Sequence, residues 1–249
     1  MKSQIFRFLT WSQKYTKTDM TYLAKGGFWL SIGHTVQILG GVAVTIVLAN
    51  TLSKSDLGLY QFILSTATIL GAFTLTGLAV AITTTTAKGD DGALRSGVRT
   101  KLKWNLGIVL ASAAVAGYYF LNDNQTLGTA FLIVGAFAPF IESLHLYQPY
   151  LIGKQDFKYN AFLNILRKLI PMSVIIPVAI FDGDPLRLVF TYFASHAITM
   201  ALLYKLTVWR YQPPLSPDFS STVRFSKHLS VMSLAGRVVS HIDKVLIFH

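Results

Sequence analysis

The sequence predicts an all-α protein, a polytopic transmembrane helical bundle with six spans and the start of a seventh. Hydrophobic residues make up 52% of the 249 residues and charged residues only 13%, whereas a soluble domain carries about 25% charged residues. Apolar runs of about 20 residues, the length that a helix needs to cross a bilayer, recur along the chain. Strand-like alternation is absent from these runs, which favours helices over a membrane barrel.

Each expected span corresponds to one apolar run between short polar segments. The fifth run is short unless its helix begins nearer Phe162, which places Arg167 and Lys168 in the first turns. Both side chains are long enough to reach the membrane interface from there. The runs cover residues 28–49, 59–82, 104–121, 127–152, 169–181, 186–206 and 229–249.

Basic residues alternate between the two sides of the predicted bundle. The net charge of +11 also suits nucleic-acid binding, so the positions of the charges decide. The leader and the connections after the second, fourth and sixth runs hold 18 of the 22 lysines and arginines. Because basic loops stay cytoplasmic, this alternation predicts a multi-pass protein of the plasma (inner) membrane, with a cytoplasmic N-terminus and no nucleic-acid partner.

Polar segments divide the chain into four parts. Residues 1–27 form a cytoplasmic basic leader, either an interfacial helix or a disordered segment, and lack the apolar core of a signal peptide. Residues 28–206 form the six-helix bundle, in which residues 93–103 are compatible with a short helix on the membrane surface. Residues 207–228 form a cytoplasmic linker whose prolines end the sixth helix. Residues 229–249 form the first helix of a second, truncated bundle.

A capping motif precedes the second apolar run. In the sequence Ser-Lys-Ser-Asp, the Ser53 side chain is expected to cap the second helix, and the Asp56 side chain to bind the Ser53 backbone amide. Gly58 is expected to let the start of the helix pack closely against a neighbour. We interpret Ser53, Asp56 and Gly58 as a structural motif and not as a ligand site.

Several segments resemble the polysaccharide and O-antigen flippases, which belong to the multidrug/oligosaccharidyl-lipid/polysaccharide exporter superfamily. They are "KGGFWLSIGHTVQILGG", "LANTLSKSDLGLYQF", "GLAVAITTTTAKG" and "SHIDKVLI". Members usually have twelve to fourteen helices in two pseudo-symmetric bundles. The resemblance therefore implies that this chain is a fragment, covering the N-terminal bundle and the opening of the next.

The last apolar run carries charged residues at positions where charge is unfavourable. A charged side chain at mid-bilayer costs about 2.5–3.5 kcal/mol, so it usually faces a cavity or a partner. Arg237, His241 and Lys244 share one helix face, and this basic stripe suits the pyrophosphate of a lipid-linked substrate. Alternatively, Lys244 reaches the interface, Asp243 pairs with a neighbouring residue, and the stripe binds no ligand.

Polar residues in the first span give a second set of candidates. His34 and Gln37 share a helix face, and the family resemblance makes them candidates to line a substrate cavity. Alternatively, they form ordinary hydrogen bonds between helices, while Gly33, Gly40 and Gly41 allow close helix packing.

An acid and a histidine share one face of the fourth span. Glu142 and His145, together with Asp243 of the last run, are candidates for coupling transport to a proton or cation. Alternatively, Glu142 and His145 form a structural pair joined to Tyr147 and Gln148. The Glu-x-x-His spacing also occurs in di-iron sites, but those sites need further glutamates, and this chain has only one, so we expect no metal.

The sequence contains no phosphate-binding loop, nucleophile elbow, zinc-protease motif or cysteine, so we expect neither an enzyme nor a cofactor. The family resemblance implies alternating-access transport of a polyprenyl-pyrophosphate-linked oligosaccharide. The expected partners are the lipid-linked glycan, membrane lipids and glycan polymerase machinery. The alternatives are a related exporter, such as a peptidoglycan-precursor flippase or a drug antiporter with an acidic cavity, and a membrane subunit or enzyme of glycan assembly.

Overall fold

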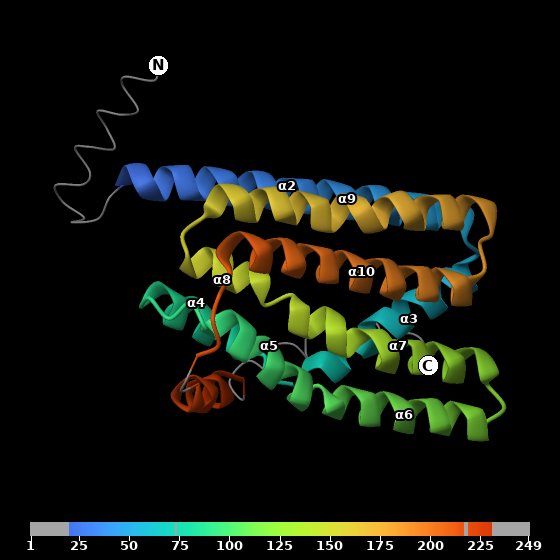
Figure 1. Ribbon diagram of the computed structural model, residues 1–249. Helices are drawn as coiled ribbons and strands as arrows, with labels where there is room; N and C mark the ends of the chain where they lie inside the picture. Colours follow the sequence, from blue (N-terminus) through green and yellow to red (C-terminus); the bar gives the residue numbers. More distant parts are fainter. Residues whose placement is uncertain (1–19, 73, 217–218, 231–249) are drawn as a thin grey trace, which may run out of the picture.

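The computed structural model describes residues 20–72, 74–216 and 219–230, and within these ranges all regular secondary structure is helical, which confirms the all-α prediction. Residues 220–230 form a further helix after α10 (Figure 1). The helices are α2 (Met20–Thr51), α3 (Lys54–Ala72), α4 (Leu78–Ala87), α5 (Ala93–Trp104), α6 (Leu106–Leu121), α7 (Gln125–Leu144), α8 (Tyr147–Gly153), α9 (Phe157–Phe181) and α10 (Pro185–Tyr211).

Five segments of the described chain are long and apolar enough to cross a membrane. They are Gly26–Thr51, Ala93–Leu121, Gln125–Gly153, Phe157–Phe181 and Pro185–Tyr211. The expected uninterrupted helix over residues 59–82 is wrong, because α3 ends at Ala72 and α4 begins at Leu78. The full count of six spans and a seventh remains a prediction.

A contact with a distant helix accompanies the break between α3 and α4. The backbone N–H of Gly77 donates to Ser230 Oγ at 2.9 Å. A Cβ atom at Gly77 would lie 2.5 Å from the Ser226 carbonyl oxygen, so only glycine permits this approach. The contact between Gly77 and Ser230 therefore lies within residues 59–82, for which hydropathy alone predicts a continuous helix.

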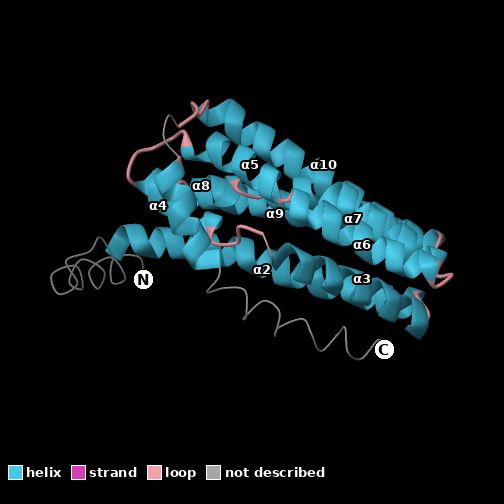
Figure 2. Cartoon of the chain, turned by 90° about the horizontal axis from the view of Figure 1, so that it is seen from below, coloured by secondary structure: helices cyan, strands magenta, loops and turns pink. Residues whose placement is uncertain are grey.

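The long helices lie side by side in mixed directions. Helices α2 and α9 run parallel to each other, α10 and α7 run parallel to each other in the opposite direction, and α6 runs antiparallel to α7 (Figure 1). The order of neighbours is α2, α9, α10, α7 and α6, and α3 packs across α7 and α10 (Figures 1 and 2). The short helices α4 and α8 pack together at one end, beside α5. The connections α2–α3, α6–α7 and α9–α10 meet at the other end.

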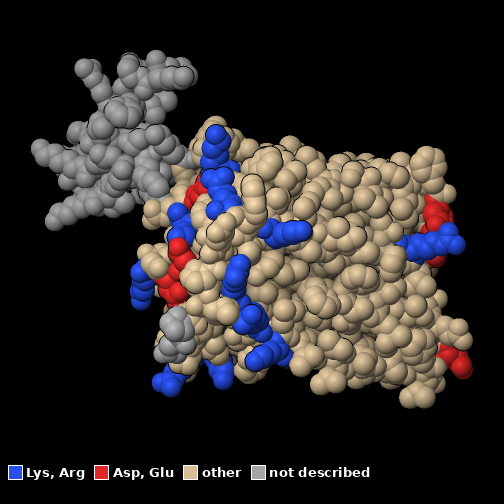
Figure 3. Space-filling model, in the orientation of Figure 1, with Lys and Arg blue, Asp and Glu red and all other residues tan. Residues whose placement is uncertain are grey.

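Charge separates the two ends of the bundle. We call the end formed by α4, α8 and the adjoining parts of α5, α9 and α10 the basic end, because most of the described lysines and arginines gather there (Figure 3). The opposite end carries Lys54 and Arg187, and Arg187 is paired with Asp182 at 2.7 Å. The fold thus brings the basic connections, which are far apart in sequence, to one end.

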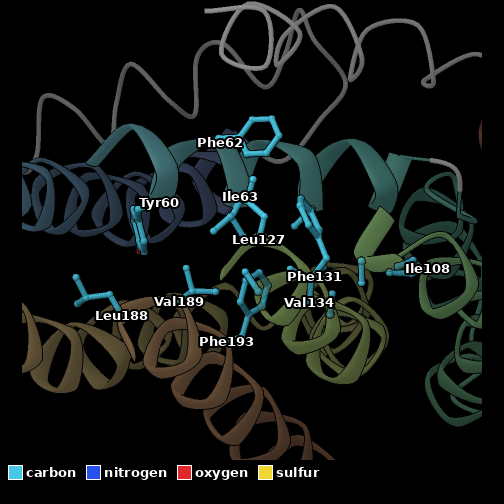
Figure 4. Close-up of a cluster of buried hydrophobic side chains, with 14 of the residues drawn as sticks. Tyr60, Phe62, Ile63, Ile108, Leu127, Phe131, Val134, Leu188, Val189 and Phe193 are labelled. Carbon is cyan, nitrogen blue, oxygen red and sulfur yellow. The ribbon is translucent and has the colours of Figure 1, made fainter. Parts of the chain in front are cut away.

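Two apolar cores stabilise the bundle, one toward each end. Tyr60, Ile63, Phe131 and Phe193 belong to the core that joins α3, α6, α7 and α10 (Figure 4). The second core, at the basic end, joins α4, α5, α8, α9 and α10. Ile141 of α7 packs against both cores, so the two meet near the C-terminal end of α7. The largest buried side chains of the second core are Leu78, Ile82, Leu94, Leu146, Tyr147, Tyr150, Leu151 and Leu163.

A glycine stripe brings α2 close to α9. Gly26, Gly33 and Gly40 are spaced by seven residues and lie on one face of α2. A Cβ atom at Gly33 would lie 3.4 Å from the Ala161 Cα atom, and one at Gly40 only 2.8 Å from Lys168 Cγ. The predicted role of Gly33 and Gly40 in close helix packing is therefore confirmed.

The capping motif at the start of α3 forms with one difference from expectation. The Ser53 hydroxyl oxygen accepts a hydrogen bond from the Asp56 backbone N–H at 3.1 Å. The same hydroxyl donates to Asp56 Oδ2 at 2.6 Å, so the carboxylate binds the Ser53 side chain instead of its backbone amide. Gly58 is exposed, and no described atom lies within 4 Å of the position that a Cβ atom would occupy, so the close packing expected there is not found.

The proline-rich linker lies against α5. Helix α10 continues to Tyr211, and the segment that follows is held to the bundle by hydrogen bonds of Ser216. Its backbone N–H donates to Ser96 Oγ at 2.9 Å, and its hydroxyl donates to Asp90 Oδ2 at 2.7 Å. Helix 220–230 is then held to α4 through Thr222, whose hydroxyl lies 3.2 Å from that of Thr85.

We expect Gly33→Leu to destabilise the protein by about 1–3 kcal/mol, because the larger side chain has no space between α2 and α9. The measurement is thermal unfolding of the purified protein in detergent. The matched control is Gly27→Leu, since no described atom lies within 4 Å of the corresponding position. Equal effects of the two substitutions would contradict the proposed role of the glycine stripe.

Ser53→Ala removes the acceptor for the Asp56 N–H, and we expect it to lower stability by about 0.5–2 kcal/mol. Chemical or thermal unfolding of the two proteins under identical detergent conditions measures the difference. Ser53→Thr retains the hydroxyl group and should restore most of the loss. A full loss in the threonine variant would argue against the cap.

Candidate functional site

A cavity with two cationic side chains lies between α2, α7, α9 and α10. We call it the cationic cavity, and its volume is about 270 Å³. It adjoins two further cavities at the point where the two apolar cores meet. The residues that line the cationic cavity are Gln37, Ile141, His145, Arg167, Lys168, His196 and Met200.

Arg167 is the centre of a network of neutral polar groups. Its guanidinium donates to the Gln37 side-chain oxygen on α2 and to Gln148 Oε1 on α8, the latter at 3.4 Å. It also contacts Nε2 of His145, which accepts from the guanidinium when the ring proton is on Nδ1. Arg167 forms no ion pair with a carboxylate in the described part of the chain, and its hydrogen-bond partners there are neutral groups.

Arg167 lies well inside the span that contains it. Helix α9 begins at Phe157 and ends at Phe181, so Arg167 is about 15 Å along the axis from one end and about 21 Å from the other. The expectation that Arg167 and Lys168 lie in the first turns and reach the interface is therefore wrong, because the helix begins earlier than predicted. Both residues are half-buried and line the cavity instead.

Lys168 lies along the backbone of α2. Its methylene groups pack over Gly40, and its Nζ atom lies 3.7 Å from the position that a Cβ atom of Gly41 would occupy. A larger residue at Gly40 would overlap this side chain. As with Arg167, no ion pair with a described carboxylate is formed. Two neighbouring cations therefore share one cavity without a described counter-charge.

Glu142 lines both adjoining cavities and forms an ion pair with Lys101. The distance between Lys101 Nζ and Glu142 Oε2 is 3.0 Å, and the Lys101 side chain is only 8% exposed. This pair connects α5 to α7 beside a cavity of about 420 Å³. Asn105, one turn along from Lys101, strengthens the same connection by donating to the Pro139 carbonyl and to Ser143 Oγ at 3.0 and 2.8 Å.

His196 of α10 separates the cationic cavity from the cavity toward the opposite end. Its Nδ1 atom lies 2.8 Å from the Tyr192 carbonyl oxygen, and its ring lies 4.1 Å from the Tyr192 ring centre. These contacts fix the ring, and His196 lines both cavities.

The predicted site residues are only partly brought together. Gln37 lines the cationic cavity, whereas His34 is exposed and is not among the residues that line it. Glu142 and His145 both line the adjoining cavity of about 420 Å³ and interact electrostatically, but the ion pair of Glu142 is formed with Lys101. The Nε2 atom of His145 lies 2.7 Å from Gln148 Oε1, as expected for the pair with Gln148. The remaining predicted residues, Arg237, His241, Asp243 and Lys244, lie outside the described residues.

Sequence reasoning missed Arg167, Lys168 and Lys101 as site residues. The signal for the first two was the Arg-Lys pair between two apolar segments, preceded at helical spacing by Asn160 and Asn164. Across the described residues, no group of three or more histidine, cysteine, aspartate and glutamate side chains has a metal-binding arrangement.

The fold and the cavity define the class: a polytopic helical membrane protein with a cationic cavity between its spans. A family model described as "Polysaccharide biosynthesis protein" matches residues 23–248. Because this match covers nearly the whole sequence, the chain belongs to that family, as the sequence resemblance implied. A comparison with curated proteins gives no match.

A solved structure supports the same fold. It is that of a MOP superfamily transporter from Pyrococcus furiosus, for which a reverse polarity of the binding pocket suggests a different function. The TM-score is 0.65 at 15% sequence identity, and the match covers 87% of this chain and 52% of the transporter chain. The present chain thus spans about half the length of that transporter.

We expect a double-mutant cycle between Lys101→Met and Glu142→Gln to give a coupling energy of about 1–3 kcal/mol, because Lys101 is buried and Glu142 only partly exposed. Thermal unfolding in detergent of the parent, both single variants and the double variant supplies the cycle. Arg187→Gln with Asp182→Asn, an exposed pair at the opposite end, is the control and should give a smaller value. Coupling energies of equal size at both pairs would contradict the importance of the buried pair.

Proposed function

We propose that this chain forms part of a flippase that moves a polyprenyl-pyrophosphate-linked oligosaccharide across the plasma (inner) membrane, with the basic end in the cytoplasm. The single observation that carries this proposal is the cationic cavity, in which Arg167 and Lys168 face the same space without a described carboxylate partner. Membership of the polysaccharide biosynthesis family supports the choice of substrate class.

The chemistry of the cavity suits a pyrophosphate. Arginine donates in a planar fork that matches phosphate oxygens, and lysine adds a mobile point charge. The anionic headgroup loses its water on leaving the cytoplasm, and the two cations replace part of that hydration. The neutral partners of Arg167, which are Gln37, His145 and Gln148, release the guanidinium to the headgroup without the penalty of breaking an ion pair.

Transport requires a second bundle facing this one. In the proposed mechanism the two bundles rock about the cavity, which opens first to the cytoplasm and then to the far side, as in transporters built from structural repeats. Arg237, His241 and Lys244 extend the cationic surface in this proposal. The apolar tail of the substrate stays in the bilayer, so only the polar headgroup has to enter the cavity.

Glu142 and Asp243 are the proposed sites of coupling to an ion gradient, with His145 beside Glu142. Glu142 lines two of the three described cavities and lies next to a buried cation, so protonation or cation binding at its carboxylate would weaken the attraction to Lys101. This change would loosen α5 from α7. The two cavities that Glu142 lines share Ile141, His145 and His196 with the cationic cavity.

Among the alternatives, a drug antiporter is disfavoured by the same charges. Cationic drugs require an acidic cavity, whereas the cationic cavity is lined by Arg167 and Lys168 and by no described carboxylate. A peptidoglycan-precursor flippase carries the same pyrophosphate chemistry and differs in the attached sugar. A non-transport role in glycan assembly predicts essential carboxylates in the loops, with Asp90 and Asp91 as the cytoplasmic pair.

The test is transport of a polyprenyl-pyrophosphate-linked saccharide into proteoliposomes by the full-length protein. We expect Arg167→Gln combined with Lys168→Gln to reduce the initial rate at least about tenfold, because each charge-assisted hydrogen bond contributes roughly 1.5–3 kcal/mol. In cells the same variant should reduce the surface polysaccharide.

The matched control is Lys158→Gln, which removes an exposed cation from the first turn of α9 and should leave transport unchanged. The thermal stability of each variant separates loss of function from loss of folding. Unchanged transport by the stable double variant would refute the proposed function, and an equal loss on removing Lys158 would show a general effect of charge.

A further inference from the structure

A row of basic side chains lies on the outer face of α5. Arg95, Arg99 and Lys103 recur every four residues, which places them on one side of the helix. None of the three forms an ion pair with a described residue. In contrast, Lys101 and Arg210, at the same end of the bundle, are paired with carboxylates.

Part of α10 near the same end extends this basic surface, since Tyr204 packs against the second core, to which Leu94 and Val98 of α5 also belong. Arg95 and Arg99 both lie close enough to Tyr204 to interact electrostatically with its hydroxyl group. Lys205 is exposed beside Tyr204, and Trp209, one turn further, is 78% exposed. Basic side chains gather on this face over α5 and near the end of α10 (Figure 3).

The same face continues into an apolar surface toward the middle of the bundle. Helix α6 presents Leu106 and Leu110, which are 62% and 72% exposed and follow Arg99 and Lys103 at helical spacing. Phe140 of α7, the helix between α6 and α10, is exposed as well. Cations at the end of the bundle and apolar groups nearer its middle match the headgroup and the acyl chains of a phospholipid.

We propose that this face binds the headgroup of an anionic glycerophospholipid from the surrounding membrane. Arg95 and Arg99 donate to the phosphate oxygens, while Lys103 and Lys205 add attraction to the negative charge. Trp209 occupies the headgroup level, where tryptophan is enriched in membrane proteins. A free phosphate would use the cations but leave the exposed leucines in water, so the apolar surface favours the lipid.

Occupation of this site would act on the interior through α5. Arg95 and Arg99 lie on the outer side of the helix, whereas Lys101 points inward to Glu142. A lipid bound across α5 and α10 fixes the position of α5, and with it the distance between Lys101 and Glu142. The site is separate from the cationic cavity, so its test does not depend on the transported substrate.

The test is a lipid titration of the full-length protein in detergent, followed by thermal unfolding and native mass spectrometry. We expect phosphatidylglycerol to raise the unfolding midpoint and to remain bound, and phosphatidylcholine to do neither. Arg95→Gln combined with Arg99→Gln should weaken phosphatidylglycerol binding at least about tenfold. Lys88→Gln, which removes an exposed cation from the α4–α5 connection, is the control and should bind as the parent does.

A single variant and a phosphate control complete the test. Lys205→Gln changes an exposed side chain only and should weaken binding several-fold, so it replaces the double variant if that protein does not fold. Inorganic phosphate at the same concentration should leave the midpoint unchanged. Equal binding of both lipids, equal losses in the Lys88 variant, or a full effect of inorganic phosphate would each overturn the proposal.

Discussion

The close approach of α2 and α9 determines where the two cations of the cationic cavity lie. Because Gly33 has no side chain, the α2 backbone packs against Ala161, and Gln37 reaches the guanidinium of Arg167. Because Gly40 and Gly41 also lack side chains, the Lys168 side chain can lie along the backbone of α2. Larger residues at these positions would separate the helices, and the cationic cavity would lose one of its walls.

The position of the cavity between two apolar cores follows from the cost of burying charge. Apolar packing fills the two halves of the bundle, and the ionisable groups collect at the level of Ile141, where the cores meet. Lys101 is compensated there by Glu142, and Arg167 by amide and imidazole groups. The site therefore combines one charge that is held by an ion pair with others that can still bind an anion.

Hydropathy was sufficient to predict the all-α class and most helix positions, since burial of backbone polar groups in a bilayer permits little else. It failed at residues 59–82, where a contact between Gly77 and Ser230 accompanies the division of the helix. Helical phase identified Gln37, but His34, one turn away, lies at the exposed edge of the same face. The partner of Glu142 could not be inferred, because Lys101 comes from another helix and local spacing pointed to His145.

The linker after α10 has a mechanical consequence for the whole bundle. Ser216 is tied to Asp90 and Ser96, and helix 220–230 to Thr85 and the Gly77 backbone. A displacement of that helix must either pull α4 and α5 with it or rupture these ties. Residues 212–230 therefore couple mechanically to α4 and α5. A movement of the chain beyond residue 230 would be transmitted to α5, the helix that carries Lys101.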